Sequence, residues 1–330
     1  MTIFVVAVAR CSSATLISSL SHIRPISRWA GARTRKYKST TFEPSDTASW
    51  TIEIAFWRNL VALLPFLAIA LLFPLEQATR FTAERGIVTV PSDPVEIIIM
   101  PEFQRGVSVA YLDSPGPLDK GQSTFYAVAP LPADWTGEQI RSFLREYNLY
   151  SLQDLTIHEG VPGHYLQLAL SNRYPSMLRS VLWSGPFVEG WAVYAEQVMI
   201  EAGYQDNDPL QRLITLKWYL RAVTNAIIDS AIHVDGMTRD QAMKLMVEGG
   251  FQEEREAAGK WIRAQLTSAQ LSTYFVGYQE HIEMRAAVEK EWGGEFTLRR
   301  YHDQALSYGS PPVKYVRALI LGEPIPRKDD

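Results

Sequence analysis

Two histidines separated by a proline and a glycine place the strongest constraint on how this chain of 330 residues folds. Residues 155–167 read Leu-Thr-Ile-His-Glu-Gly-Val-Pro-Gly-His-Tyr-Leu-Gln, so His158 and His164 are six positions apart. On an ideal helix that spacing turns the two side chains roughly 120° away from each other. Pro162 removes a backbone donor and clashes with the carbonyl of His158 four residues earlier, and Gly163 tolerates unusual dihedral angles. The stretch therefore predicts a helix that is broken or bulged between the histidines.

The side chains in and after this stretch are those of a catalytic zinc site. Two neutral imidazoles and one carboxylate, with water in the fourth position, are a common arrangement for catalytic zinc. A further carboxylate beside the metal can act as the general base on that water. We predict His158, His164 and Glu189 as ligands of one zinc ion and Glu159 as the base. Glu196, seven residues after Glu189 and near the same helix face, is also a candidate ligand.

Two alternatives to catalytic zinc remain open from the residues alone. The usual short motif is H-E-x-x-H, with its histidines at i and i+4, and a kinked helix whose histidines make ordinary hydrogen bonds also fits the observed spacing. Manganese, iron or cobalt could occupy the same ligands. The only cysteine is Cys11, so any metal must be held by histidine and carboxylate.

Several motifs occur in the same order as in a known family. The chain from about Ile87 to about Leu321 resembles the DUF885 family of predicted zinc-dependent hydrolases, which is similar to gluzincin-type helical metallopeptidases. It departs from those peptidases by two extra residues between the histidines. The matching stretches are Met100–Tyr111, Leu144–Asn148, Ile157–Gln167, Glu189–Glu196 and Gln304–Tyr308.

The resemblance sharpens the expected roles of several side chains. A family motif begins at Glu189, which favours this residue as the ligand and leaves Glu196 to hydrogen-bond a ligand histidine. Asp229 and His233 belong to a polar stripe at i and i+4, and the resemblance implies that they point into the cleft, where His233 stabilises an oxyanion and Asp229 sets its tautomer. The resemblance also implies that Tyr308 stabilises the oxyanion. A solvated helix face and a core tyrosine are the alternatives.

The pattern predicts a mainly α fold, a helical metallopeptidase-like domain with a small antiparallel β-sheet. The sheet is expected from three β-like runs at 95–100, 107–111 and 124–128. From Trp135 onward the chain has helical periodicity, and one helix is expected to run into the histidine motif. Capping boxes are expected at 136–139, 238–241 and 267–270.

The first 85 residues predict two further segments. Residues 1–42 are basic, rich in serine and free of acidic residues, which is the composition of an organelle transit peptide. A disordered basic tail or a wrongly placed gene start is the alternative. Residues 43–85 contain an uncharged apolar run at 60–75, which is either a membrane helix or a buried core helix kinked at Pro65. Residues 86–330 form the expected hydrolase domain, which corresponds to the C-terminal half of the family's full domain.

These observations together predict a zinc-dependent hydrolase that cleaves a peptide or other amide substrate. The alternative is an inactive, truncated family member that acts as a membrane-anchored binding or scaffold protein. A net charge of −4 gives no reason to expect a nucleic-acid partner. We expect the protein to associate with a membrane through residues 60–75, and a mitochondrial membrane is one candidate.

Overall fold

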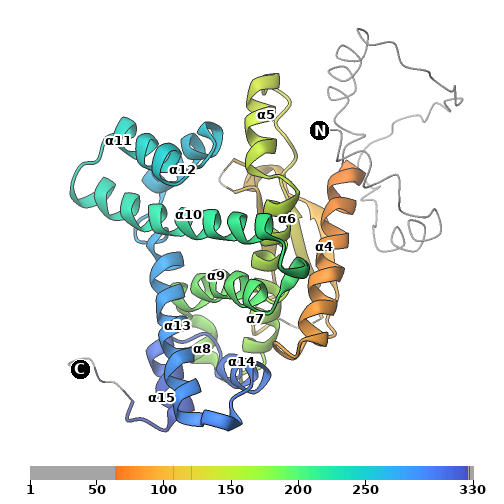
Figure 1. Ribbon diagram of the computed structural model, residues 1–330, viewed down its shortest axis with the longest axis vertical. Helices are drawn as coiled ribbons and strands as arrows, with labels where there is room; N and C mark the ends of the chain where they lie inside the picture. Colours follow the sequence, from red (N-terminus) through yellow and green to blue (C-terminus); the bar gives the residue numbers. More distant parts are fainter. Residues whose placement is uncertain (1–63, 107, 120, 326, 328–330) are drawn as a thin grey trace, which may run out of the picture. The chain divides into compact units, whose positions relative to one another are not determined.

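The computed structural model describes residues 64–106, 108–119, 121–325 and 327 (Figure 1). The chain divides into two compact units, Met1–Phe66 and Leu67–Asp330, and the candidate site lies within the second. The basic segment 1–42 and most of segment 43–85 lie outside the described residues.

Helices dominate the described residues, which confirms the prediction of a mainly α fold. Three short strands lie between the first helix and the rest. The helices are α4 (Leu64–Glu84), α5 (Gly137–Glu146), α6 (Leu149–Glu159), α7 (His164–Ser171), α8 (Met177–Val181), α9 (Gly185–Glu201), α10 (Pro209–Val234), α11 (Arg239–Lys244), α12 (Glu254–Leu266), α13 (Ser272–Trp292), α14 (Leu298–Leu306) and α15 (Val313–Leu321).

The sheet is mixed, so the antiparallel prediction is wrong for one of its two strand pairs. Its order is β1 (Val95–Ile99), β3 (Thr124–Val128) and β2 (Ala110–Asp113). β2 pairs antiparallel with β3, whereas β1 pairs parallel with β3. The physical reason is that the chain reverses direction between β1 and β2 and again between β2 and β3, so β3 runs in the same direction as β1. Because β3 inserts between the two earlier strands, it pairs with both. β2 therefore forms one edge of the sheet, next to the helices that carry the site.

The helix boundaries follow local side-chain caps. Thr136 and Thr238 each form the predicted capping box with the glutamine three residues later. The capping box predicted at Thr267 is wrong, because α13 begins only at Ser272 and the Thr267 hydroxyl donates to the carbonyl of Arg263 in α12. The single helix expected before the histidine motif is two helices, because the Asn148 side chain accepts from two backbone N–H groups and starts α6 afresh.

The core is built around the crossing of α9 and α13. A Cβ atom added to Gly190 in α9 would lie 2.2 Å from the carbonyl carbon of Gly277 in α13, so the two backbones touch. Large side chains of α9 fill the space on either side of this contact. Phe187, Trp191 and Tyr194 are all buried in the main apolar cluster. Glu189 therefore stands on a helix that close packing holds in place.

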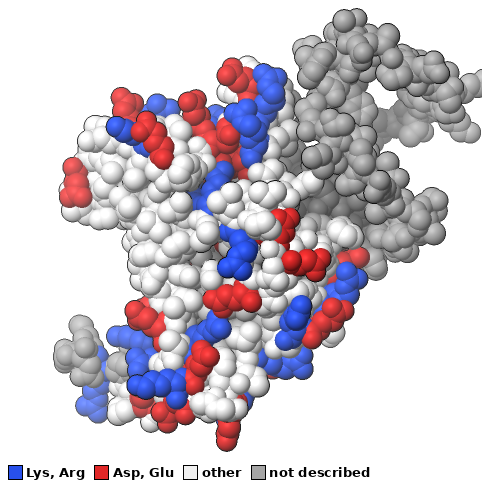
Figure 2. All heavy atoms as spheres, viewed as in Figure 1, with Lys and Arg blue, Asp and Glu red and all other residues white. Residues whose placement is uncertain are grey.

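The apolar run at 60–75 begins outside the described residues, and its described part enters α4. Within the described part of the chain, no helix combines the length and apolar character needed to cross a bilayer. Acidic and basic side chains are interspersed over the described part of the face in Figure 2. That mixture is typical of an ordinary solvated surface.

Candidate metal centre

The helix carrying the first histidine ends where the sequence predicts a break. α6 stops at Glu159, the peptide bond between Val161 and Pro162 is cis, and α7 begins at His164. A Cβ at Gly163 would lie 1.9 Å from the His158 carbonyl oxygen, so only glycine fits. The break thus turns two histidines from successive helices toward each other.

The break is held from the opposite side by the second motif. The indole Nε1–H of Trp191 in α9 donates to the Pro162 carbonyl oxygen at 2.8 Å. Trp191 is two residues from Glu189, so one hydrogen bond ties the loop between the histidines to the helix that carries the predicted carboxylate ligand. The two sequence motifs are thereby packed face to face.

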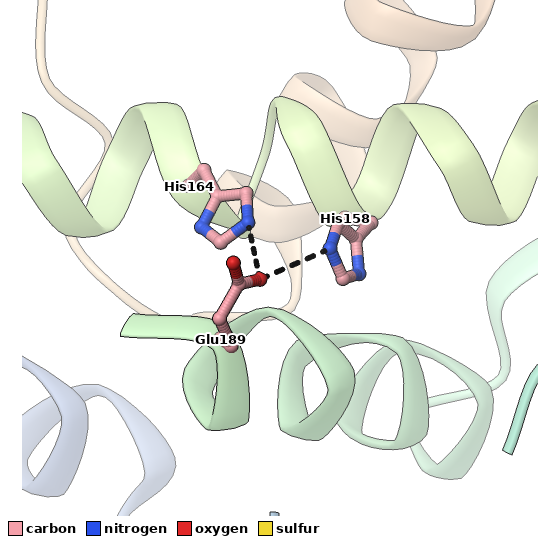
Figure 3. Close-up of side chains that lie close together, drawn as sticks. All are labelled: His158, His164 and Glu189. Atoms are coloured by element: carbon pink, nitrogen blue, oxygen red, sulfur yellow. Dashed lines mark ion pairs between the residues drawn. The ribbon is translucent and has the colours of Figure 1, made fainter. Parts of the chain in front are cut away.

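His158, His164 and Glu189 form a compact group (Figure 3). One potential ligand atom from each residue lies within 4.8 Å of the others. Nε2 of His164 is 3.4 Å from Oε2 of Glu189, and Nε2 of His158 is 4.0 Å from the same oxygen. Ligands of a tetrahedral zinc ion, each bound at about 2 Å, lie roughly 3.3 Å apart. The donor set and its spacing therefore fit zinc after small side-chain adjustments.

Glu196 orients the first histidine. Its Oε1 accepts a hydrogen bond from Nδ1 of His158 at 2.7 Å, and its side chain is 3% exposed. With Nδ1 engaged, Nε2 is the ring nitrogen that faces His164 and Glu189. Burial lowers the pKa of His158 to about 4, so its imidazole is neutral near pH 7, as a metal ligand must be.

His164 and Glu189 form a charge-assisted pair. Burial by itself would lower the pKa of His164, but the hydrogen bond and negative charge of Glu189 raise it above the usual value. Burial likewise opposes ionisation of Glu189, yet the contact with His164 lowers the pKa of this carboxyl. A divalent cation would replace the proton that these two groups share.

Glu159 lies beside the group, at the end of α6. Burial raises the pKa of its carboxyl, although the two imidazoles partly counter this effect. The backbone of Leu112 on the edge strand β2 hydrogen-bonds the same carboxyl. The predicted base is thus positioned between the histidines and an edge of the sheet.

Two predicted residues make their hydrogen bonds at the corner between α12 and α13. Asp229 accepts from the backbone N–H groups of Ala269 and Ser272, at 3.1 and 2.9 Å, at the start of α13. Nε2 of His233 lies 2.9 Å from the Ala264 carbonyl and 2.8 Å from the Thr267 carbonyl, at the end of α12. The polar stripe on α10 therefore faces the corner between α12 and α13. There both side chains hydrogen-bond backbone groups, whereas the prediction placed them in the substrate cleft.

Tyr308 makes its polar contacts with Gln304 in α14 and with Arg179 in α8. Its hydroxyl accepts from the Gln304 side chain at 3.1 Å, and its carbonyl accepts from Arg179. The ring packs against the main apolar cluster. Stabilisation of an oxyanion by Tyr308 stays a prediction.

The sequence analysis missed three polar residues close to the candidate ligands: Tyr274, Arg263 and Gln270. The ring of Tyr274 stacks against that of His158, with centroids 6.2 Å apart and planes at 25°. Its hydroxyl accepts from Arg263 at 2.9 Å and from Gln270 at 3.3 Å. These residues follow the histidine motif by about a hundred positions and share no motif with it, so no local pattern could have found them.

A cavity of about 380 Å³ lies between α7, α8 and the loop that follows β2. Its lining includes Leu168, one helical turn after His164, and Val188, the neighbour of Glu189. Further lining comes from residues 114–117, the loop that follows β2. The cavity is thus lined by sequence neighbours of two candidate ligands and by the loop after the edge strand.

Comparison with known families decides the classification. A sequence model described as "Bacterial protein of unknown function (DUF885)" matches residues 74–320. The chain belongs to the DUF885 family. No curated protein matches it.

Two solved structures, both described as putative lipoproteins, are similar to this chain. The one from Shewanella oneidensis, "of unknown function", is 40% identical with a TM-score of 0.69, over 86% of this chain and 51% of its own. The one from Colwellia psychrerythraea is 26% identical with a TM-score of 0.67, over 82% of this chain and 43% of its own. This DUF885 chain therefore spans about half the length of those relatives.

Proposed function

We propose that this DUF885 protein is a zinc-dependent hydrolase that cleaves a peptide or another amide. The observation that carries the proposal is the convergence of His158, His164 and Glu189 with Glu159 beside them. Within the described residues the group offers three protein ligands, and three ligands plus an open position are typical of catalytic rather than structural zinc.

Glu159 is the general base in this proposal. A bound zinc ion would supply a Lewis acid for the substrate carbonyl and lower the pKa of a water molecule. Glu159 takes a proton from the attacking water and delivers it to the leaving nitrogen as the C–N bond breaks.

Tyr274 is the phenol best placed to stabilise the oxyanion. Both hydrogen bonds to its hydroxyl oxygen come from donors, Arg263 and Gln270, which leaves its own proton free to donate. The stacking of its ring on His158 keeps that hydroxyl near the candidate ligands. We propose this role for Tyr274 in place of His233 and Tyr308.

An extended peptide is the substrate shape that the surroundings favour. β2 is an edge strand whose Leu112 backbone reaches Glu159, and an edge strand can bind a peptide by strand addition. The cavity beyond β2 has the size for a side chain or two of such a peptide.

The first test is the zinc content of the full chain. We expect about one zinc per chain, lost in His158→Ala and His164→Ala, because each variant removes one of three ligands. Glu159→Gln should retain zinc and lower the rate of peptide cleavage by about 10²- to 10⁴-fold, the usual contribution of a general base. Mass spectrometry of a peptide pool incubated with each protein measures cleavage. A folded wild-type protein that binds no zinc would overturn the proposal.

Attachment to a membrane is a second proposal, favoured by the description of both solved relatives as lipoproteins. Fractionation of cells that express the full chain tests it. Recovery in the membrane fraction after a high-salt wash is the expected result, and recovery in the soluble fraction contradicts it.

A further inference from the structure

The corner between α12 and α13 is fixed from outside by α10. The carboxylate of Asp229 binds the N–H groups of Ala269 and Ser272, and it also accepts from the Ser272 hydroxyl at 2.8 Å. His233, one turn later on α10, donates to carbonyl oxygens at the end of α12. The backbone at Ala269 is left-handed, with φ of +61°, a conformation that a residue with a Cβ rarely adopts unless its surroundings enforce it.

Gln270 extends from this corner to a candidate metal ligand. Its Nε2 donates to Oε1 of Glu189 at 3.2 Å. Its own Oε1 accepts from the Arg263 guanidinium at 3.0 Å. Arginine can only donate, so the contact with Arg263 decides which end of the amide faces Glu189. The end that reaches the carboxylate is the NH₂ group.

The two oxygens of Glu189 consequently have different surroundings. Oε1 is held by Gln270, whereas Oε2 is the oxygen that faces Nε2 of His158 and of His164. A carboxylate with one oxygen anchored cannot rotate that oxygen into the metal position without losing a hydrogen bond. The carboxylate is thereby oriented before any metal arrives.

We propose that Gln270 is a positioning residue that presents Oε2 of Glu189 to zinc. In this view, Asp229 and His233 serve the site indirectly by holding the corner from which Gln270 extends. The inference rests on the proposed zinc site and adds a residue to it that acts through Glu189.

The test is zinc affinity, measured by competition with a chelating dye on the metal-free full chain. Gln270→Ala should weaken zinc binding about 10- to 100-fold, the usual effect of losing a group that orients a ligand. Gln270→Glu keeps the shape but replaces the donor with a second carboxylate, and it should weaken binding as well. Gln279→Ala is the matched control, because Gln279 lies within α13, shortly after Gln270, and donates to the Tyr219 hydroxyl at 2.9 Å. Its affinity should equal that of the wild type.

A double-mutant cycle separates positioning from a general loss of structure. Glu189→Ala alone should bind zinc weakly, and adding Gln270→Ala should cause no further loss, because the group through which Gln270 acts is gone. An equal loss in both backgrounds would overturn the inference. So would wild-type affinity in both Gln270 variants, although the zinc site itself would then stand. Absence of zinc from the wild type would instead overturn the proposed function and this inference together.

Discussion

His158 shows how a single side chain in this site is set by its neighbours. One ring nitrogen binds the buried Glu196 carboxylate and the other faces the remaining candidate ligands. Metal-ligating histidines commonly donate their second N–H to a carboxylate, which fixes the ring and raises its basicity as a ligand. The spacing made Glu196 a candidate ligand, and the family resemblance, by favouring Glu189, left this hydrogen-bonding role to Glu196.

Glu196→Ala should therefore weaken zinc binding about 10- to 100-fold. Glu196→Gln retains an acceptor for Nδ1 but loses the charge, so its affinity should fall between those of the alanine variant and the wild type. Glu201→Ala serves as control, because Glu201 lies on the same helix and pairs with Arg285 at 2.6 Å. Dye competition measures all three. An affinity of Glu196→Ala equal to that of the control would show that the hydrogen bond does not tune the site.

Gln270 marks the limit of residue-level prediction. Its sequence, Thr267-Ser-Ala-Gln270, matches the pattern of a capping box, and the prediction used the glutamine for that purpose. In the structure the same side chain reaches Glu189, 81 positions away in sequence. A local pattern cannot distinguish a glutamine that folds back onto its own helix start from one that reaches across to another helix.

At the scale of the element, the crossing of α9 and α13 holds the second motif in place. Gly190 follows Glu189 directly, and its missing side chain lets the two helix backbones touch at Gly277. Any added atom must push the helices apart, and that movement would displace Glu189 from the histidines. The glycine in the second motif therefore serves packing.

Gly190→Ala should lower the free energy of unfolding by about 1–3 kcal/mol or more, because it overpacks a backbone contact. Gly259→Ala is the matched control in α12, where an added Cβ meets nothing within 4 Å. That substitution should raise stability by about 0.4–1 kcal/mol, since alanine restricts the unfolded chain and favours helix. Urea denaturation measures both variants. Equal stabilities would contradict the close approach of α9 and α13.

Helix type and position were largely predictable from the sequence, whereas strand order was not. The strands near 95–100 and 124–128 and two of the three capping boxes are confirmed. The parallel pairing of β1 with β3 was missed because it depends on which strand enters the middle of the sheet. Neighbouring strands along a chain favour antiparallel pairing locally, and only the packed sheet shows the insertion.

At the scale of the whole molecule, two further buried histidines connect distant segments. His281 in α13 hydrogen-bonds the Phe187 carbonyl at 2.9 Å. His302 in α14 hydrogen-bonds the Ile87 carbonyl and the Tyr194 hydroxyl, at 2.7 and 2.8 Å. Burial lowers the pKa of His281 to about 4 and that of His302 to about 3. Both imidazoles are therefore neutral in the folded protein.

Acid should destabilise the fold through these two groups. In the unfolded chain they take up protons near pH 6.5, whereas the folded protein resists protonation until about pH 4. Their contribution is thus complete above pH 6.5 and is lost as pH falls toward 4, by about 3 kcal/mol for His281 at most. Melting temperatures of the zinc-free chain between pH 7 and 4.5 measure the effect. The decline should be shallower in His281→Gln, and an unchanged slope would contradict the assignment.

Sequence by itself determined the break between the histidines, the helical fold class and the chemical type of the candidate ligands. These depend on short-range causes: a proline, a glycine, caps and the donor atoms of the side chains. Only the tertiary structure decided which distant residues surround that group. Gln270 and Tyr274 contact candidate ligands, whereas the hydrogen bonds of His233 and Tyr308 are to other residues. The path of the chain between α10 and α13 brings together residues whose spacing in the sequence carries no local signal.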